Sequence, residues 1–174
     1  MALHHPARVA IVGATGYGGA ELLRHLAVHP AVRLTRLVAK DNIGKRADDV
    51  HLSLAGLTDL RIEDLTPEQV AADADVVCVG LPHRVSAAVV ARYVDLGKAV
   101  VDLSGDYRLR DAAVYERYYE AVHPEPHRLG SFVYGLPELH REAIRTARHV
   151  ASPGCFATAI TLADRKSTRL NSSH

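Results

Sequence analysis

Cysteine, tryptophan and long hydrophobic runs are scarce or missing in this sequence. Its 174 residues include two cysteines, Cys78 and Cys155, and no tryptophan. Two distant cysteines do not suggest a disulfide framework, and no apolar run approaches the ~18 residues of a membrane-spanning helix. Residues 1–8 lack the basic segment and apolar core of a signal peptide. We therefore expect a cytoplasmic protein that does not contact a membrane.

The sequence also lacks an excess of charge of either sign. The 21 basic and 20 acidic residues give a formal net charge of +1, so no overall field attracts nucleic acid. Eleven histidines are present, but no group of His and Cys residues has the spacing of a zinc site. We expect neither a nucleic-acid partner nor a bound metal.

What the sequence does contain is an alternation of short β-branched runs and stretches with helical periodicity. Helices are predicted to begin near residues 20, 66 and 86, and strands are predicted over residues 8–13, 32–39, 75–80 and 98–103. Thr66 is the expected N-cap of the second of these helices, with Pro67 at its first position. Such alternation is typical of βαβ crossovers, so the sequence predicts an α/β fold with a doubly wound parallel sheet. Residues 40–60 show no clear period and are predicted to be mostly loop, with a short helix or strand as the alternative.

The pattern weakens after residue 103. Helices are predicted over residues 111–119 and 137–146, and short strands over residues 131–134 and 149–151. A further helix is predicted over residues 155–163, with Phe156, Ile160 and Leu162 on a buried face. The composition then changes, because residues 164–174 contain a single aliphatic residue. We expect a disordered or foreign tail there.

A glycine-rich turn joins the first predicted strand to the first predicted helix, with the sequence Gly13-Ala-Thr-Gly-Tyr-Gly-Gly19. Glycines in such a turn allow a tight corner, let backbone approach a pyrophosphate and let the helix pack on the strand. The helix N-terminus adds unpaired N–H groups and a partial positive charge for the phosphates. The pattern favours a dinucleotide site, and the alternative is a purely structural turn.

The end of the second predicted strand should lie at the ribose of the dinucleotide, where an acidic residue favours NAD. The strand ends at Ala39-Lys40, with no acid at its tip. Lys40, Lys45 and Arg46 would suit a 2′-phosphate, so the sequence favours NADP. Asp41 argues against this choice, and the alternative for these charges is an ordinary solvated loop.

Cys155 follows Pro153-Gly154 at the start of a predicted helix. A helix N-terminus favours a thiolate, and a thiolate can attack an acyl carbonyl. The alternative is a buried structural cysteine. That structural role is the one we expect for Cys78, which lies inside an apolar strand.

Two other predicted strand ends carry candidate ligand-binding residues, since ligands collect at the strand ends of a doubly wound sheet. Asp106 and Arg108 follow one of them, and an arginine there suits a phosphate or carboxylate. The alternative is a surface salt bridge. Pro82 and His83 follow the other strand end, where they would border the nicotinamide, and a loop-capping role is an equal alternative for His83.

Six ordered segments together resemble the N-acetyl-γ-glutamyl-phosphate reductases, the semialdehyde dehydrogenases of arginine biosynthesis. They are residues 13–22, 81–83, 101–109, 115–119 with 123–124, 134–139 and 152–158. The resemblance implies a Rossmann domain over residues 1–150 and a following α+β catalytic and dimerisation domain. Residues 151–163 would form the cysteine loop and the start of that second domain, and residues 164–174 the tail.

The resemblance further implies a homo-oligomeric, NADPH-dependent enzyme. Its reaction would reduce N-acetyl-γ-glutamyl phosphate to the semialdehyde through a thioester on Cys155, with release of phosphate. Arg108 would bind the substrate anion. Together with Lys40 and Pro82 from the strand ends, the residues expected at the cofactor are Gly13, Thr15, Gly16, Tyr17 and Gly18.

Departures from the family pattern affect these expectations. Ala39 and Lys40 stand where the family often has serine and arginine, and Arg84 stands where glycine is usual. The family's catalytic histidine lies beyond residue 163, so we expect this chain alone to show little or no reductase activity. Related alternatives are an aspartate-semialdehyde dehydrogenase or a lysine-pathway acyl-phosphate reductase. An alternative of another class is a non-catalytic dinucleotide-binding module that makes no use of Cys155.

Overall fold

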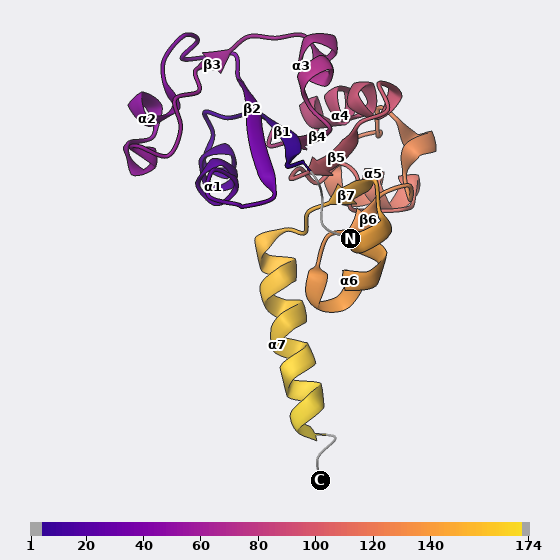
Figure 1. Ribbon diagram of the computed structural model, residues 1–174. Coiled ribbons are helices and arrows are strands. Elements are labelled where there is room, and N and C mark those ends of the chain that lie inside the picture. The colour runs from indigo at the N-terminus through magenta and orange to yellow at the C-terminus, as the bar shows by residue number, and fades with distance from the viewer. Residues whose placement is uncertain (1–4, 172–174) are drawn as a thin grey trace.

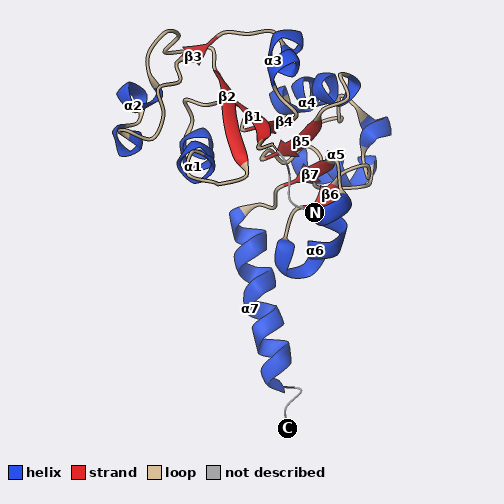
Figure 2. Ribbon diagram, in the orientation of Figure 1, coloured by secondary structure: helices blue, strands red, loops and turns tan. Residues whose placement is uncertain are grey.

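The computed structural model describes residues 5–171, and its centre is a sheet of seven parallel strands (Figure 1, Figure 2). The strand order is β3-β2-β1-β4-β5-β7-β6. The strands are β1 (Ala7–Val12), β2 (Val32–Val38), β3 (Ile62–Glu63), β4 (Val76–Val79), β5 (Ala99–Asp102), β6 (Val133–Tyr134) and β7 (His149–Ala151). All neighbouring strands pair in parallel, which confirms the predicted sheet.

Helices cover both faces of this sheet. α1 (Tyr17–Leu26) packs with α2 (Ala47–Val50) and the 3-10 turn η1 (Leu52–Leu54) on one face, and α3 (Pro67–Asp73) and α4 (Val85–Asp95) pack on the other. The remaining helical elements are α5 (Ala112–Tyr119), η2 (Pro126–Arg128), α6 (Pro137–Thr146) and α7 (Cys155–Asn171). The sheet is therefore doubly wound, as predicted.

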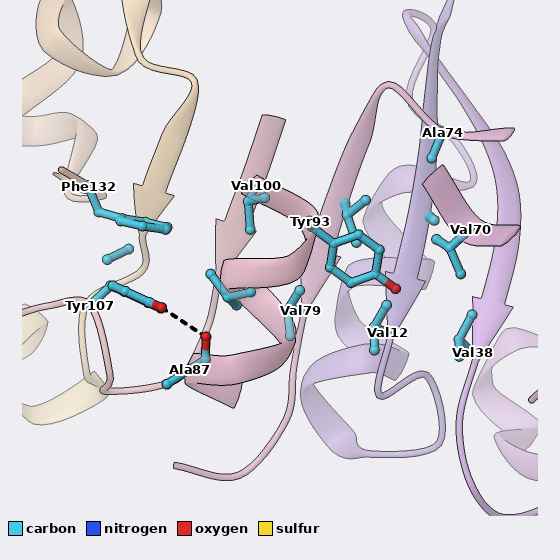
Figure 3. Close-up of a cluster of buried hydrophobic side chains, with 14 residues drawn as sticks. Val12, Val38, Val70, Ala74, Val79, Ala87, Tyr93, Val100, Tyr107 and Phe132 are labelled. Carbon is cyan, nitrogen blue, oxygen red and sulfur yellow. Dashed lines mark hydrogen bonds between the residues drawn. The ribbon is translucent and has the colours of Figure 1, made fainter. Parts of the chain in front are cut away.

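The residues of each buried strand alternate between two apolar cores. Ala10 and Val12 of β1 face the core beneath α3 and α4, whereas Ile11 faces the core beneath α1. Figure 3 shows the first of these cores, where Tyr93 of α4 lies among valines from several strands. Burial of such side chains contributes about 1.5–3 kcal/mol each, so the two cores hold the strands in a fixed register.

β3 had no counterpart in the sequence prediction, which named no element between residues 60 and 66. It has two residues, and these pair with Leu37 and Val38 of β2. Two positions are too few to show an alternating pattern, so periodicity could not reveal the strand. α3 is different, because Thr66 accepts a hydrogen bond from the Gln69 N–H and Pro67 occupies the first turn, as the sequence predicted.

The chain reverses its direction of travel across the sheet next to β1. β2 and β3 extend from one side of β1, and β4, β5, β7 and β6 extend from the other. Because all strands are parallel, their carboxyl ends share one edge, and the reversal opens a crevice there. This edge is the place where a doubly wound sheet binds its ligands.

α7 corrects two expectations about the last part of the chain. The helix runs to Asn171, so residues 164–171 are helical rather than disordered, and the remainder of the expected tail lies outside the described residues. This stretch contains no proline or glycine to end a helix. α7 extends away from the sheet (Figure 1), and Phe156 and Ile160 are 81% and 69% exposed rather than buried.

None of the helices within residues 5–171 is both long and apolar enough to cross a bilayer.

We expect Gly13→Ala to destabilise the fold far more than Gly44→Ala. Both glycines have a positive φ, +85° and +83°, so both substitutions carry the ~1–2 kcal/mol strain of a left-handed residue. A Cβ on Gly13 would also lie 2.3 Å from the Gly80 carbonyl oxygen, whereas a Cβ on Gly44 would meet nothing within 4 Å. Urea unfolding should show about 2 kcal/mol of additional loss in Gly13→Ala. Equal losses in the two variants would contradict the packing described.

Candidate active site

The corner between β1 and α1 is built from backbone contacts that leave no room for side chains. A Cβ on Gly13 would lie 2.3 Å from the Gly80 carbonyl oxygen at the end of β4. A Cβ on Gly19 would lie 2.3 Å from the Gly13 carbonyl oxygen. The N–H groups of Gly13 and Ala14 both donate to the Val38 carbonyl oxygen, at 2.8 and 3.1 Å. The ends of β1, β2 and β4 are thereby held together at the glycine turn.

Gly16 and Gly18 have a different environment. The nearest atom to a Cβ on Gly16 would be the Gly13 carbonyl oxygen at 3.5 Å, and for Gly18 it would be Leu103 Cδ2, also at 3.5 Å. These are ordinary contact distances, so packing within the chain does not require glycine at either position. Both glycines line an open hollow, and bare backbone there fits a ligand that approaches closely, such as a pyrophosphate.

The hollow brings together all seven residues that the sequence predicted at a cofactor. It has a volume of about 480 Å³, and the seven are Gly13, Thr15, Gly16, Tyr17, Gly18, Lys40 and Pro82. An adjoining compartment of about 260 Å³ has walls that include Leu65, Val85 and Val89. A flat apolar ring fits such a compartment, and a charged diphosphate fits the open hollow beside it.

The basic residues predicted at a 2′-phosphate have partners within the chain. Lys40 Nζ lies 2.6 Å from Asp64 Oδ1, and its side chain is 83% exposed. Lys45 Nζ donates to the Asn42 side-chain oxygen at 2.9 Å. Arg46 pairs with Asp48 and Asp59 and is outside the residues that line the hollow. Of the three candidates, the structure therefore places only Lys40 in the hollow.

Arg108 and the turn that precedes Cys155 meet at the carboxyl ends of β5 and β7. Arg108 Nε donates to the Ser152 carbonyl oxygen at 2.7 Å, and Nη2 donates to the Leu103 carbonyl oxygen at 2.8 Å. Nη1 lies 3.1 Å from the position that a Cβ on Gly154 would take. Backbone carbonyl groups therefore hold the guanidinium, rather than a surface salt bridge. The next residue, Cys155, is exposed and begins α7.

A chain of contacts connects the glycine turn to this cysteine. Gly18 faces the side chain of Leu103, and the carbonyl group of Leu103 binds Arg108, whose Nη1 lies against Gly154. In the sheet, β1 and β7 are separated by β4 and β5, a distance of about 14 Å at the usual strand spacing. The thiol and the glycine-lined hollow therefore occupy the same edge of the sheet.

His83 forms a loop contact that the sequence had left open. Its Nδ1 accepts a hydrogen bond from the Gly105 N–H at 2.7 Å, and its ring packs edge-to-face with Tyr119. The turn at Gly105 is close to the same tyrosine, because a Cβ there would lie 2.4 Å from the Tyr119 hydroxyl. His83 thus holds the loop that leads to Arg108.

Two fully buried carboxylates shape that loop. Asp106 accepts hydrogen bonds from the N–H groups of Arg84 and Ala87 at the start of α4 and from the Tyr115 hydroxyl at 2.9 Å. This is neither the surface salt bridge nor the ligand contact considered from the sequence. Asp102 accepts from the hydroxyl groups of Ser86 and Ser104, at 2.9 and 2.7 Å.

Sequence reasoning did not identify Asp102. Burial raises the pKa of its carboxyl group, and the hydrogen bonds from Ser104 and Ser86 oppose this shift. An acidic residue at the end of an otherwise apolar strand was the available indication, because a carboxylate at such a place needs several donors. Arg84, which stands where glycine is usual, has a positive φ of +70°. In this conformation its backbone nitrogen lies 3.0–3.1 Å from both carboxylate oxygens of Asp106.

His123 lies in an aromatic cluster next to these carboxylates and is 2% exposed. Its Nδ1 accepts from the Glu125 N–H at 3.0 Å, and within residues 5–171 its Nε2 has no hydrogen-bond partner. The rings of Tyr107 and Tyr115 pack against it edge-to-face, with centroids at 5.2 and 4.7 Å. Burial lowers its pKa, and the charges of Asp106 and Glu125 partly oppose this shift.

The other cysteine, Cys78, is 5% exposed within β4, and burial raises the pKa of its thiol to about 11. It therefore lies in the core, as predicted. In the part of the chain that the structure describes, no group of three or more His, Cys, Asp or Glu side chains is placed to hold a metal ion.

Comparison with known proteins shows which family has this arrangement. Residues 8–147 match the family described as semialdehyde dehydrogenase, NAD binding domain. The chain belongs to this family. The semialdehyde dehydrogenase match covers the strands that form the hollow, so binding of a nicotinamide dinucleotide is the property that this part of the chain shares with the family.

Among curated relatives, the N-acetyl-gamma-glutamyl-phosphate reductase of Pelobacter propionicus is 49% identical over 154 residues, 88% of this chain and 44% of that protein. The LysW-L-2-aminoadipate/LysW-L-glutamate phosphate reductase of Sulfurisphaera tokodaii is 44% identical over 156 residues, 90% of this chain and 45% of that protein. This chain thus spans less than half the length of either relative.

Solved structures of the same kind share the fold. Aspartate semialdehyde dehydrogenase II of Vibrio cholerae superposes with a TM-score of 0.65 at 20% identity, over 90% of this chain and 44% of that one. The Candida albicans aspartate semialdehyde dehydrogenase, solved with NADP, gives a TM-score of 0.53 at 26% identity, over 62% and 32% of the two chains.

We expect His123 to make the fold less stable as the pH falls below about 6.5. An unfolded histidine binds a proton near pH 6.5, whereas the buried ring has a lowered pKa, so the unfolded state takes up more protons. Stability is full above pH 6.5 and is lost at up to about 1.4 kcal/mol per pH unit until the folded-state pKa is reached. His123→Phe cannot titrate, so urea unfolding across mildly acidic pH should show a shallower decline than in the wild type. Parallel declines would rule out this role.

Proposed function

We propose that this chain supplies the dinucleotide site and the nucleophile of an NADPH-dependent acyl-phosphate reductase acting on N-acetyl-γ-glutamyl phosphate. The observation that carries the proposal is the position of the exposed Cys155. It directly follows Gly154, which packs against Arg108, at the same sheet edge as the glycine-lined hollow. The 49% identity to the Pelobacter propionicus enzyme supports the choice of acyl group. Turnover is proposed for a protein of the relatives' full length, whose second domain begins within residues 151–163.

The cofactor side of the site uses the backbone of the glycine turn. Gly16 and Gly18 let the pyrophosphate approach the first turn of α1, whose N–H groups and dipole favour phosphate. The apolar compartment beside the hollow has a size and lining suited to the adenine ring. Lys40 lies at the rim of the hollow, where it can reach a 2′-phosphate. Bound NADPH supplies the hydride for the reaction.

The nucleophile side of the site uses Cys155 and Arg108. The thiolate of Cys155 attacks the acyl carbon, forms a thioester and displaces inorganic phosphate. Arg108 carries the positive charge that a phosphate or carboxylate of the substrate requires. Because Cys155 is the first residue of α7, the N–H groups in the first turn of that helix can stabilise the oxyanion that forms during the attack. Hydride supplied to the acyl carbon would reduce the thioester to a thiohemiacetal, whose collapse would give the aldehyde and release the thiolate of Cys155.

A second candidate for the acyl group follows from the relatives. The Sulfurisphaera tokodaii protein, 44% identical, is named for LysW-linked aminoadipate and glutamate phosphates. Both candidate substrates are acyl phosphates of an amino dicarboxylic acid, so the chemistry at Cys155 would be the same.

Trapping of the thioester tests the proposal. Incubation of the chain with N-acetyl-γ-glutamyl phosphate should add one acyl group to Cys155, seen by intact mass and peptide mapping. Cys155→Ser should abolish the adduct, whereas the matched variant Cys78→Ser should retain it, because Cys78 is buried in the core. A chain that binds NADPH but forms no adduct would be a dinucleotide-binding module, and the reductase proposal would be wrong.

A further inference from the structure

Asp41 occupies a fixed position in the proposed cofactor hollow. Its Oδ1 accepts a hydrogen bond from the Thr15 hydroxyl at 2.6 Å, and its Oδ2 accepts from the Asn42 side-chain amide at 2.9 Å. Both Thr15 and Asp41 line the hollow, and Thr15 belongs to the glycine turn itself. The carboxylate at the end of β2 is therefore held next to the phosphate-binding corner rather than left free in a mobile loop.

Lys40 does not outweigh this carboxylate. Of the residues that line the hollow, Lys40 and Asp41 carry charge, and their charges are opposite. The ammonium group of Lys40 is in addition paired with Asp64 at 2.6 Å. A 2′-phosphate brings nearly two negative charges, so it meets one carboxylate in the hollow and a lysine that must leave or share its partner.

A 2′-hydroxyl meets the opposite situation. It can donate a hydrogen bond to the Asp41 carboxylate, which is the way an acidic residue at the end of the second strand recognises the ribose of NAD. It also leaves the exposed Lys40–Asp64 pair undisturbed. The fixed carboxylate thus favours the hydroxyl and opposes the phosphate, while Lys40 acts in the other direction.

We infer that Asp41 is a cofactor-specificity residue, and that this chain binds NAD with an affinity within about tenfold of its affinity for NADP. The inference rests on the proposed function and deepens it, because it concerns which dinucleotides the same hollow accepts. Ala39 carries no charge, and among the described residues Lys40 is the one cationic side chain that lines the hollow. Within residues 5–171, no further cation lines it that would restore a strong preference for the 2′-phosphate.

Titration of the 174-residue chain with NAD and with NADP tests this inference, because binding is measured without turnover. Calorimetry should give dissociation constants within about tenfold for the wild type. Asp41→Asn keeps an oxygen that can accept from Thr15 and removes the charge, so the ratio should move toward NADP by about tenfold. Asp64→Asn releases Lys40 and should tighten NADP by about threefold with little change for NAD.

The matched control is Asp59→Asn, which removes the same charge from an exposed side chain outside the hollow. It should leave the ratio unchanged, and high salt should reduce the effect of Asp41→Asn. A wild-type preference for NADP above about a hundredfold, or an unchanged ratio in Asp41→Asn, would overturn the inference and leave the proposed function standing. Failure to bind either dinucleotide would overturn both.

Discussion

The close backbone contact between Gly13 and Gly80 is the constraint on which the rest of the site depends. It brings the ends of β1 and β4 together at the point where the strand order reverses, and Gly19 packs α1 onto the same corner. The first turn of α1 is thereby aimed at the edge of the sheet where β5 and β7 also end. Every element assigned to chemistry, including Arg108 and the start of α7, is positioned relative to this corner.

Two buried carboxylates fix the part of the site around Arg108, as the glycine contacts fix the corner between β1 and α1. Asp106 accepts hydrogen bonds from N–H groups at the start of α4, and Asp102 accepts from the hydroxyl groups of Ser86 and Ser104. The loop between β5 and Arg108 is therefore fixed by hydrogen bonds from several elements. Charged groups that are fully buried are costly unless they are bonded in this way. These hydrogen-bonded carboxylates lie at the sheet edge where Arg108 is held against the turn that precedes Cys155.

The sequence predicts the central parallel sheet, α3 with its Thr66 cap and the core position of Cys78, because each depends on local periodicity or on a local capping pattern. It also predicts that the residues of the hollow lie near one another, because the carboxyl ends of parallel strands share one edge of the sheet. It could not reveal β3, which is too short for a pattern, or the pairing of Lys40 with Asp64, which depends on where two loops meet. Asp102 and Asp106 were missed as structural acids for the same reason, since Ser86, Ala87 and Tyr115, which donate to them, come from α4 and α5.

The central claim is that the dinucleotide hollow and the thiol share one edge of the sheet. Amide chemical shifts of the isotopically labelled chain during titration with NADP would test it most directly. We expect the largest changes at residues 13–18, Gly80 and Leu81, with further changes at residues 103–108 and at Cys155 as the nicotinamide settles beside them. Changes confined to the opposite edge of the sheet, or changes at the glycine turn with none at residues 103–108 or Cys155, would contradict the account.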